Sequence, residues 1–205
     1  MRYINLREEL KDFIVFSIND IKKIDETFYR TRLNEWQNKG YIKKVIKGFY
    51  IFSDLEISEN ILFLIANKIY FPSYISLESA FSYYNIIPEG VYSVTSITTR
   101  KTFKPAGSFT NFNYKKIKEE YFFGYKLIEF KSRYFKIASL EKSIIDYFYF
   151  NQKKDSSNDF YEMRLNTSSL SEQINLKIIK NYLEIFNKKR LTRCVNNLLE
   201  FVKNA

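Results

Sequence analysis

Glu129, Phe130 and Lys131 are the first candidates for catalysis, because they match the Glu-x-Lys half of a metal-dependent nuclease site. In such a site carboxylates hold Mg²⁺ and the lysine stabilises developing charge. The site also needs an acid on the preceding strand, and the nearest candidates are Glu119 and Glu120, about ten residues upstream. Three-residue patterns of this kind arise often by chance. We therefore interpret these residues as ordinary strand charges and expect no enzymatic activity.

The chain has no histidine and only one cysteine, Cys194. This composition excludes histidine-based acid–base catalysis, Ser-His and Cys-His pairs, and most zinc sites, so we expect no metal and no cofactor. A disulfide within the chain is excluded as well, which fits a reducing cytoplasm. The charged N-terminal residues contain no visible signal peptide, and the longest apolar run, Ile61 to Ala66, is too short to span a bilayer.

Basic residues give the chain a formal charge of +10, which favours a polyanion, usually nucleic acid, as the partner. The alternative explanation is an AT-rich coding sequence, which enriches Lys together with Asn, Ile, Phe and Tyr. Hydrophobic residues make up 45% of the chain, which indicates a globular protein. Most of its 20 Phe and 17 Tyr residues must belong to the core.

The residues best suited to contact DNA lie within the first 50 positions. Asp25 can cap a helix that runs to about Lys39, where Gly40 ends it. Tyr29, Leu33 and Trp36 would share the buried face of this helix. The opposite face is polar, and we predict that it enters a major groove and reads base edges through Thr27, Arg30, Thr31 and Asn34.

The segment YIKKVIKGFYIF, at positions 41–52, alternates apolar residues with lysines and reverses at Lys47-Gly48. This pattern predicts a β-hairpin. Lys43, Lys44 and Lys47 would lie on or near its tip, where the wing of a winged helix meets DNA phosphates.

Two earlier helices complete the predicted winged helix-turn-helix domain, which spans positions 1–54. Leu6 and Leu10 recur at helical spacing in the first helix, and Ser17 with Asp20 forms the capping box that starts the second. Positions 1–53 carry 11 Lys or Arg against 7 Asp or Glu. A winged helix that is used only for protein contacts is the alternative.

Positions 55–205 are predicted to form an α/β domain, so that the fold class is α+β. Helices are expected from Ile57 to Ile69, from Leu77 to Tyr84 with Ser76 as its cap, after Ser139, and at 176–186 and 192–202. Four β-rich segments, at 91–103, 107–117, 119–130 and 133–138, predict an antiparallel sheet or an open barrel.

This second domain is also basic, with 10 Lys or Arg and 3 Glu between positions 100 and 136. The segment NKKRLTR, at positions 187–193, adds four more cations. A second contact with a polyanion and a solvated sheet face are both open explanations. The candidate residues are Arg100, Lys101, Lys104, Lys115, Lys116, Lys188, Lys189, Arg190 and Arg193.

Five motifs, in order, resemble the AbiEi family of antitoxins from bacterial type IV toxin–antitoxin pairs. They are IKGFYIF, PSYISLESAFSYY, VTSITTRKTF, FFGY and IASLEKSIIDYFY. With the predicted wing before them and helices after them, the resemblance covers nearly the whole chain. The resemblance implies an N-terminal winged helix that represses its own operon at inverted repeats. It also implies a C-terminal domain that counteracts a nucleotidyltransferase-like toxin without a stable complex.

The residues alone leave a simpler regulator open, in which an aromatic-rich second domain senses a ligand. A plain aromatic core explains the same residues. Because the basic surfaces repel each other in the absence of DNA, we expect a protein that is mostly monomeric in solution and pairs on double-stranded operator DNA.

Overall fold

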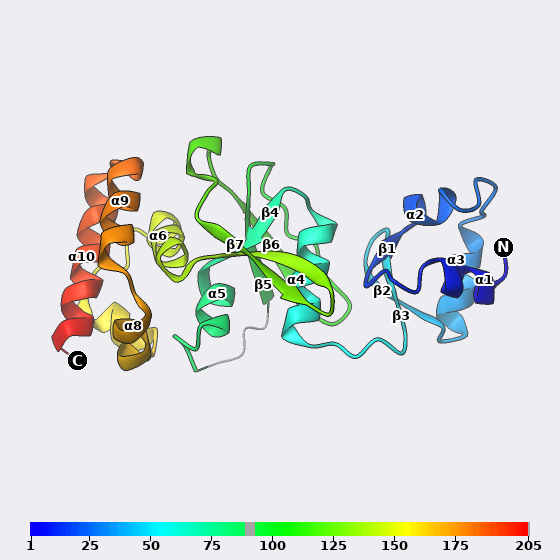
Figure 1. The fold of residues 1–205 in the computed structure, drawn as a ribbon, viewed down its shortest axis with the longest axis horizontal. Helices are drawn as coiled ribbons and strands as arrows, with labels where there is room; N and C mark the ends of the chain where they lie inside the picture. The colour runs from blue at the N-terminus through cyan, green and yellow to red at the C-terminus, as the bar shows by residue number, and fades with distance from the viewer. Residues whose placement is uncertain (89–92, 205) are drawn as a thin grey trace.

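The computed structural model describes residues 1–88 and 93–204, and its elements form three groups along an elongated molecule (Figure 1). The N-terminal unit lies at one end, a five-stranded sheet lies in the middle, and a group of helices lies at the other end. The chain termini are therefore at opposite ends of the molecule. The structure is α+β, as the sequence predicts.

The N-terminal unit combines short helices with a small sheet. Its elements are α1 (Tyr3–Glu9), β1 (Phe16–Ser17), α2 (Ile18–Lys22), α3 (Thr31–Asn38), β2 (Ile42–Ile46) and β3 (Phe49–Phe52). The predicted capping box is present, because the Ser17 hydroxyl accepts from the Asp20 backbone N–H and the Asp20 carboxylate accepts from that of Ser17. The predicted hairpin is also present, and Gly48 takes a positive φ at its turn.

Helix α3 begins later than the sequence predicts. The Asp25 carboxylate accepts hydrogen bonds from the backbone and the hydroxyl of Thr27, so it closes a tight turn instead of capping a long helix. Tyr29, expected on the buried face, is consequently 74% exposed. Phe28 is buried in its place, with its ring 5.5 Å from that of Trp36.

The small sheet, in the order β1-β3-β2, contributes buried side chains from both of its faces. Ile42, Tyr50 and Phe52 belong to the cluster that the helices of the N-terminal unit cover. Val45 and Ile51 belong to a second cluster that includes residues of α4 (Glu59–Ile69). The N-terminal unit therefore has a core of its own and also packs against the middle of the molecule.

The central sheet is mixed in direction, so the predicted antiparallel sheet or open barrel is wrong. It has the order β6-β5-β4-β8-β7 and consists of β4 (Ser73–Ile75), β5 (Ser93–Thr98), β6 (Asn111–Lys116), β7 (Tyr125–Phe130) and β8 (Arg133–Ala138). β5 pairs with β6 in parallel, and β4 pairs with β8 in parallel, while β4–β5 and β7–β8 are antiparallel.

The reason for the mixed directions lies in the connections. The segment between β5 and β6 is long enough to return the chain to the starting end of β5, so β6 runs alongside it in the same direction. β4, which the sequence does not predict, takes the central position between β5 and β8. The first predicted strand was placed from Val91, and Val91 and Tyr92 lie outside the described residues.

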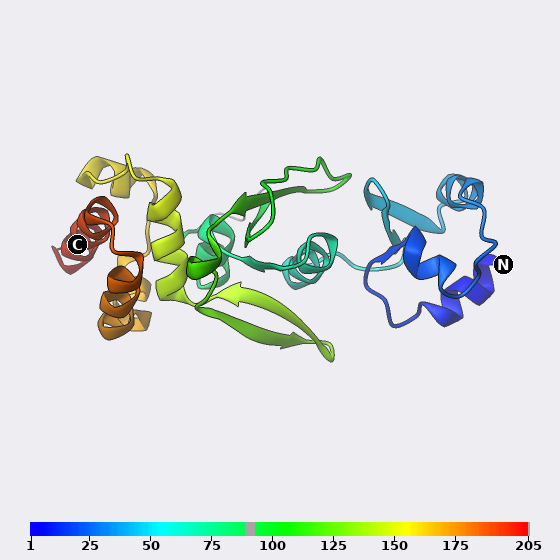
Figure 2. The same ribbon diagram turned by 90° about the horizontal axis from the view of Figure 1, so that it is seen from above.

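Helices cover the sheet and extend the molecule towards its C-terminal end. α5 (Leu77–Tyr83) and η1 (Glu119–Tyr121) precede α6 (Leu140–Phe150), which lies between the sheet and the last helices (Figures 1 and 2). Beyond it come α7 (Ser157–Glu162), α8 (Thr167–Gln173), α9 (Leu176–Phe186) and α10 (Lys189–Asn204). The start of α6 at Ser139 is as predicted, because this hydroxyl accepts from the Lys142 backbone N–H.

Helix α6 carries a fully buried ion pair within the aromatic core. The Lys142 ammonium and the Asp146 carboxylate, four residues apart, are in contact, and both side chains are 0% exposed. Asp146 also accepts from the hydroxyls of Tyr74 and Ser76, each at 2.9 Å. Ser76 thus stands at the N-cap of α5, as expected, but its hydroxyl donates to Asp146 and forms no capping hydrogen bond with the helix.

Burial dominates the titration of this pair. It raises the pKa of the Asp146 carboxyl, although Lys142 and the two hydroxyls counteract part of the effect. It lowers the pKa of the Lys142 ammonium, against the attraction of Asp146. Both shifts express the cost of holding charge away from water.

Candidate nucleic-acid interface

The predicted base-reading residues are exposed but do not all lie on one helix. Thr31 and Asn34 stand three residues apart on the outer side of α3, and Arg30 occupies its N-cap position. Thr27 lies in the preceding turn, where its hydroxyl donates to Asp25 at 2.7 Å. The first turn of α3 therefore presents a compact polar group of Arg30, Thr31 and Asn34, with Thr27 to one side.

Charge on α3 does not oppose a DNA contact. Its acidic residue, Glu35, forms an exposed ion pair with Lys39 at 2.6 Å. The hydrogen bond from Lys39 lowers the pKa of Glu35, and the same bond raises the pKa of Lys39. The pair is therefore fully charged at neutral pH and contributes no net charge to the helix.

The structure separates the three hairpin lysines. Lys44 is the cross-strand partner of Tyr50, whose side chain packs among the helices, so Lys44 projects on the face of the sheet that carries α3. Lys43 is paired with Ile51 and projects on the opposite face, and its ammonium donates to the Ser53 carbonyl at 3.1 Å. Lys47 is exposed in the turn.

The hairpin also contacts the basic segment between β5 and β6. The Ser108 backbone N–H donates to the Val45 carbonyl at 3.0 Å, and Figure 2 shows the two loops approaching each other. The chain that follows Lys104 thus lies beside the hairpin. This contact brings the loop that carries Lys104 to the β2–β3 hairpin.

The nine residues of the predicted second basic surface do not form one surface. Those on α10 and just before it lie at the end of the molecule opposite to the N-terminal unit (Figure 1). Two of these are already engaged, since Arg190 donates to the Gln152 carbonyl and Arg193 is paired with Asp155. Lys188 is half-buried there, whereas Lys189 is exposed.

The remaining five cations lie on or after β5 and β6, and they also differ in their surroundings. Arg100 stacks on Tyr70 and donates to the Phe71 carbonyl at 3.1 Å. Lys115 is half-buried, and burial lowers its pKa. Three are exposed and available to a polyanion: Lys101, Lys104 and Lys116.

The Glu-x-Lys pattern lies at the turn of a hairpin. Glu129 is near the end of β7 and accepts from the Tyr134 hydroxyl at 3.2 Å, and Lys131 has left the strand with a φ of 50°. Glu119 and Glu120 lie in η1 and not on a neighbouring strand. Within residues 1–88 and 93–204, no three Cys, Asp or Glu side chains are grouped so that they could hold a metal ion.

No family model matches the chain, and no curated protein shows significant similarity to it. The resemblance to AbiEi-family antitoxins therefore rests on the five motifs. These occupy the β2–β3 hairpin, β4 with α5, β5, the approach to β7, and the junction of β8 with α6. In the described part of the chain, no helix combines the length and apolar character needed to cross a bilayer.

Proposed function

We propose that the protein is a DNA-binding regulator and that its N-terminal unit is a winged helix. In this proposal α3 enters the major groove and the β2–β3 hairpin acts as the wing. The observation that carries it is the exposure of Arg30, Thr31 and Asn34 at the start of α3, with Lys44 on the same face of the adjacent sheet. Recognition helices contact base edges mainly through their N-terminal residues.

Binding to the DNA upstream of its own gene tests this proposal. We expect Arg30→Ala and Asn34→Ala to cost about 1–3 kcal/mol each and to relax the preference at particular base pairs. Fluorescence anisotropy with that DNA and with single-base variants measures both effects. Glu35→Gln is a matched control on the same helix, since it removes a charge that Lys39 already neutralises. An equal loss on every DNA sequence would contradict base reading.

From the sequence resemblance, we propose further that this regulator is an antitoxin of a type IV toxin–antitoxin pair. It would repress its operon through inverted repeats, as a monomer that pairs on DNA, while residues 55–205 counteract a nucleotidyltransferase-like toxin. A gene for such a toxin directly downstream is the first test. The second is rescue of toxin-expressing cells by the 55–205 fragment, without repression of the operon. A folded fragment that fails to rescue would contradict this division.

The runner-up is a stand-alone regulator whose second domain senses a ligand. One observation favours it, namely a pocket at the junction between the N-terminal unit and the central sheet that Lys68, Arg133 and Lys136 help to line. An isolated gene with no toxin gene beside it would favour this reading over the antitoxin.

A further inference from the structure

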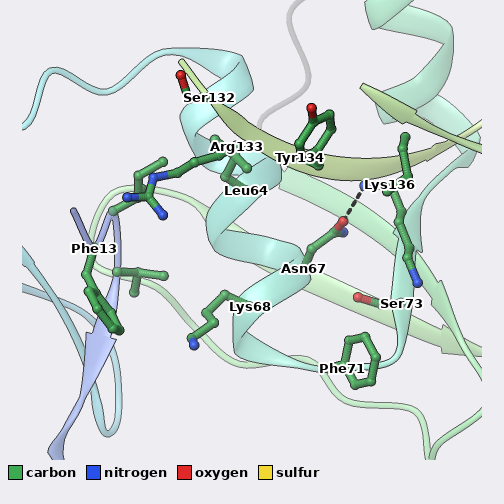
Figure 3. Close-up of a pocket in the computed structure, with 13 residues that line it drawn as sticks. Phe13, Leu64, Asn67, Lys68, Phe71, Ser73, Ser132, Arg133, Tyr134 and Lys136 are labelled. Carbon is green, nitrogen blue, oxygen red and sulfur yellow. Dashed lines mark hydrogen bonds between the residues drawn. The ribbon is translucent and has the colours of Figure 1, made fainter. Parts of the chain in front are cut away.

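A pocket of about 560 Å³ lies where the N-terminal unit meets the central sheet (Figure 3). The chain around Phe13, just before β1, forms one wall, and α4 forms a second. The start of β4 and the β7–β8 hairpin complete it. The volume is within the range of pockets that bind small molecules.

The charge of the pocket is positive and unopposed. Lys68, Arg133 and Lys136 line it, and its lining includes no carboxylate. None of the three forms an ion pair within the part of the chain that the structure describes. Such a site favours an anionic ligand, because surrounding low-dielectric walls strengthen the attraction.

The pocket wall also contains two buried polar groups that lack partners. The Ser73 side chain, 1% exposed, has a hydroxyl without a hydrogen bond. The Asn67 carboxamide oxygen accepts from the Lys136 backbone N–H at 2.6 Å, and its buried NH₂ group remains without a partner. Figure 3 shows Ser73 between Asn67, Lys136 and Phe71. Buried polar groups are normally hydrogen-bonded, so two unused donors beside lysines suit an acceptor-rich anion such as phosphate.

The pocket also has exposed aromatic side chains that could stack on a ligand. Phe71 is 66% exposed and Tyr134 is 59% exposed, although both are large rings. Both line the pocket, and the Lys136 ammonium lies 5.4 Å from the centroid of the Phe71 ring. Exposed aromatic faces beside a cation are a common surface for stacking a planar ring.

We propose that this pocket binds a nucleotide. The phosphate would interact with Lys68, Lys136 and the donors of Ser73 and Asn67, and the base would stack on Phe71 or Tyr134. Two sources share this chemistry, a free mononucleotide and the 5′-terminal nucleotide of a single strand. The site is separate from the proposed DNA-reading face of α3 and can be tested without operator DNA.

Calorimetric titration of the full-length protein tests the proposal with AMP and GMP as ligands. Adenosine and inorganic phosphate carry the two halves of the ligand, and we expect each to bind at least tenfold more weakly than AMP. Lys136→Ala should weaken AMP binding by at least tenfold. Lys126→Ala is the matched control, because Lys126 is exposed on the same hairpin and does not line the pocket.

Ser73→Ala separates binding from folding. Removing an unbonded buried hydroxyl should leave the unfolding midpoint unchanged or raise it, whereas AMP binding should weaken about tenfold through the lost hydrogen bond. A 5′-phosphorylated tetranucleotide distinguishes a free mononucleotide from a strand end. If it binds more tightly than AMP, and Ser73→Ala weakens its binding by the same factor, the ligand is the 5′ end of a single strand. Absence of binding at millimolar AMP and GMP, or AMP binding that Ser73→Ala and Lys136→Ala leave unchanged, would overturn the proposal.

Discussion

Removal of the Asp146 carboxylate should be among the most damaging single changes in the chain. Asp146 accepts from the Lys142 ammonium and from the hydroxyls of Tyr74 and Ser76. In Asp146→Ala, the ammonium stays buried with the Tyr74 hydroxyl, at 2.8 Å, as its remaining hydrogen-bond partner. Three aromatic rings also lie between 5.3 and 5.4 Å from it, and they stabilise the cation only in part.

The expected cost follows from leaving a charge unpaired inside the protein. Breaking one member of a buried ion pair typically destabilises a protein by about 3–5 kcal/mol. Lys142→Met should be similarly damaging, because it leaves the Asp146 carboxylate buried. The double variant Lys142→Met with Asp146→Leu should be less destabilised than either single variant, since apolar residues of similar volume often replace such pairs at little cost.

Urea unfolding followed by circular dichroism measures these free energies. The exposed, paired Glu35→Gln serves as a control, and we expect it to change stability by less than about 1 kcal/mol. A loss below about 1 kcal/mol for Asp146→Ala would refute the reasoning. A double variant that is less stable than both single variants would also refute it, because the buried pair would then stabilise the fold in its own right.

Three further predictions test other parts of the structure. Lys44→Ala should reduce the magnitude of the slope of log K against log salt for DNA binding by about one. Lys43→Ala should change this slope little, because Lys43 lies on the opposite face of the sheet and donates to the Ser53 carbonyl. Equal effects of the two substitutions would contradict a DNA contact from one face only. The isolated fragment 1–54 should self-associate in sedimentation experiments, because Val45 and Ile51 lose their cover. Gly124→Ala should lower the unfolding midpoint, because φ is +73° and the added Cβ would lie 3.0 Å from atoms of two side chains.

Local signals predicted much of the N-terminal unit. The capping box of Ser17 and Asp20 and the Lys47-Gly48 turn each depend on a few neighbouring residues, and the structure contains both. The predicted start of α3 was wrong because an aspartate such as Asp25 can either cap a helix or accept the hydrogen bonds of a tight turn, here from Thr27. In the structure the turn forms, and Phe28 is buried against Trp36 directly after it.

Features that depend on distant segments were beyond local patterns. β4 has only three residues, and its place in the centre of the sheet comes from pairing with β5 and β8. The pocket combines four segments, so no single stretch of sequence indicates it. The buried ion pair did have a signal, because Lys142 and Asp146 stand at positions i and i+4 of a helix whose other residues are apolar except for Glu141 and Ser143.

The chain has one tryptophan and one cysteine, and they stand near its two ends. Trp36 is 3% exposed beside Tyr3 and Phe28, so its fluorescence reports on the N-terminal unit. Cys194, on α10, is fully buried, and burial raises the pKa of its thiol, so a thiol reagent labels it only when the C-terminal helices open. The unmodified protein thus contains a spectroscopic reporter at one end and a chemical reporter at the other. Comparing their denaturation curves shows whether the elongated molecule unfolds in one cooperative step or from one end first.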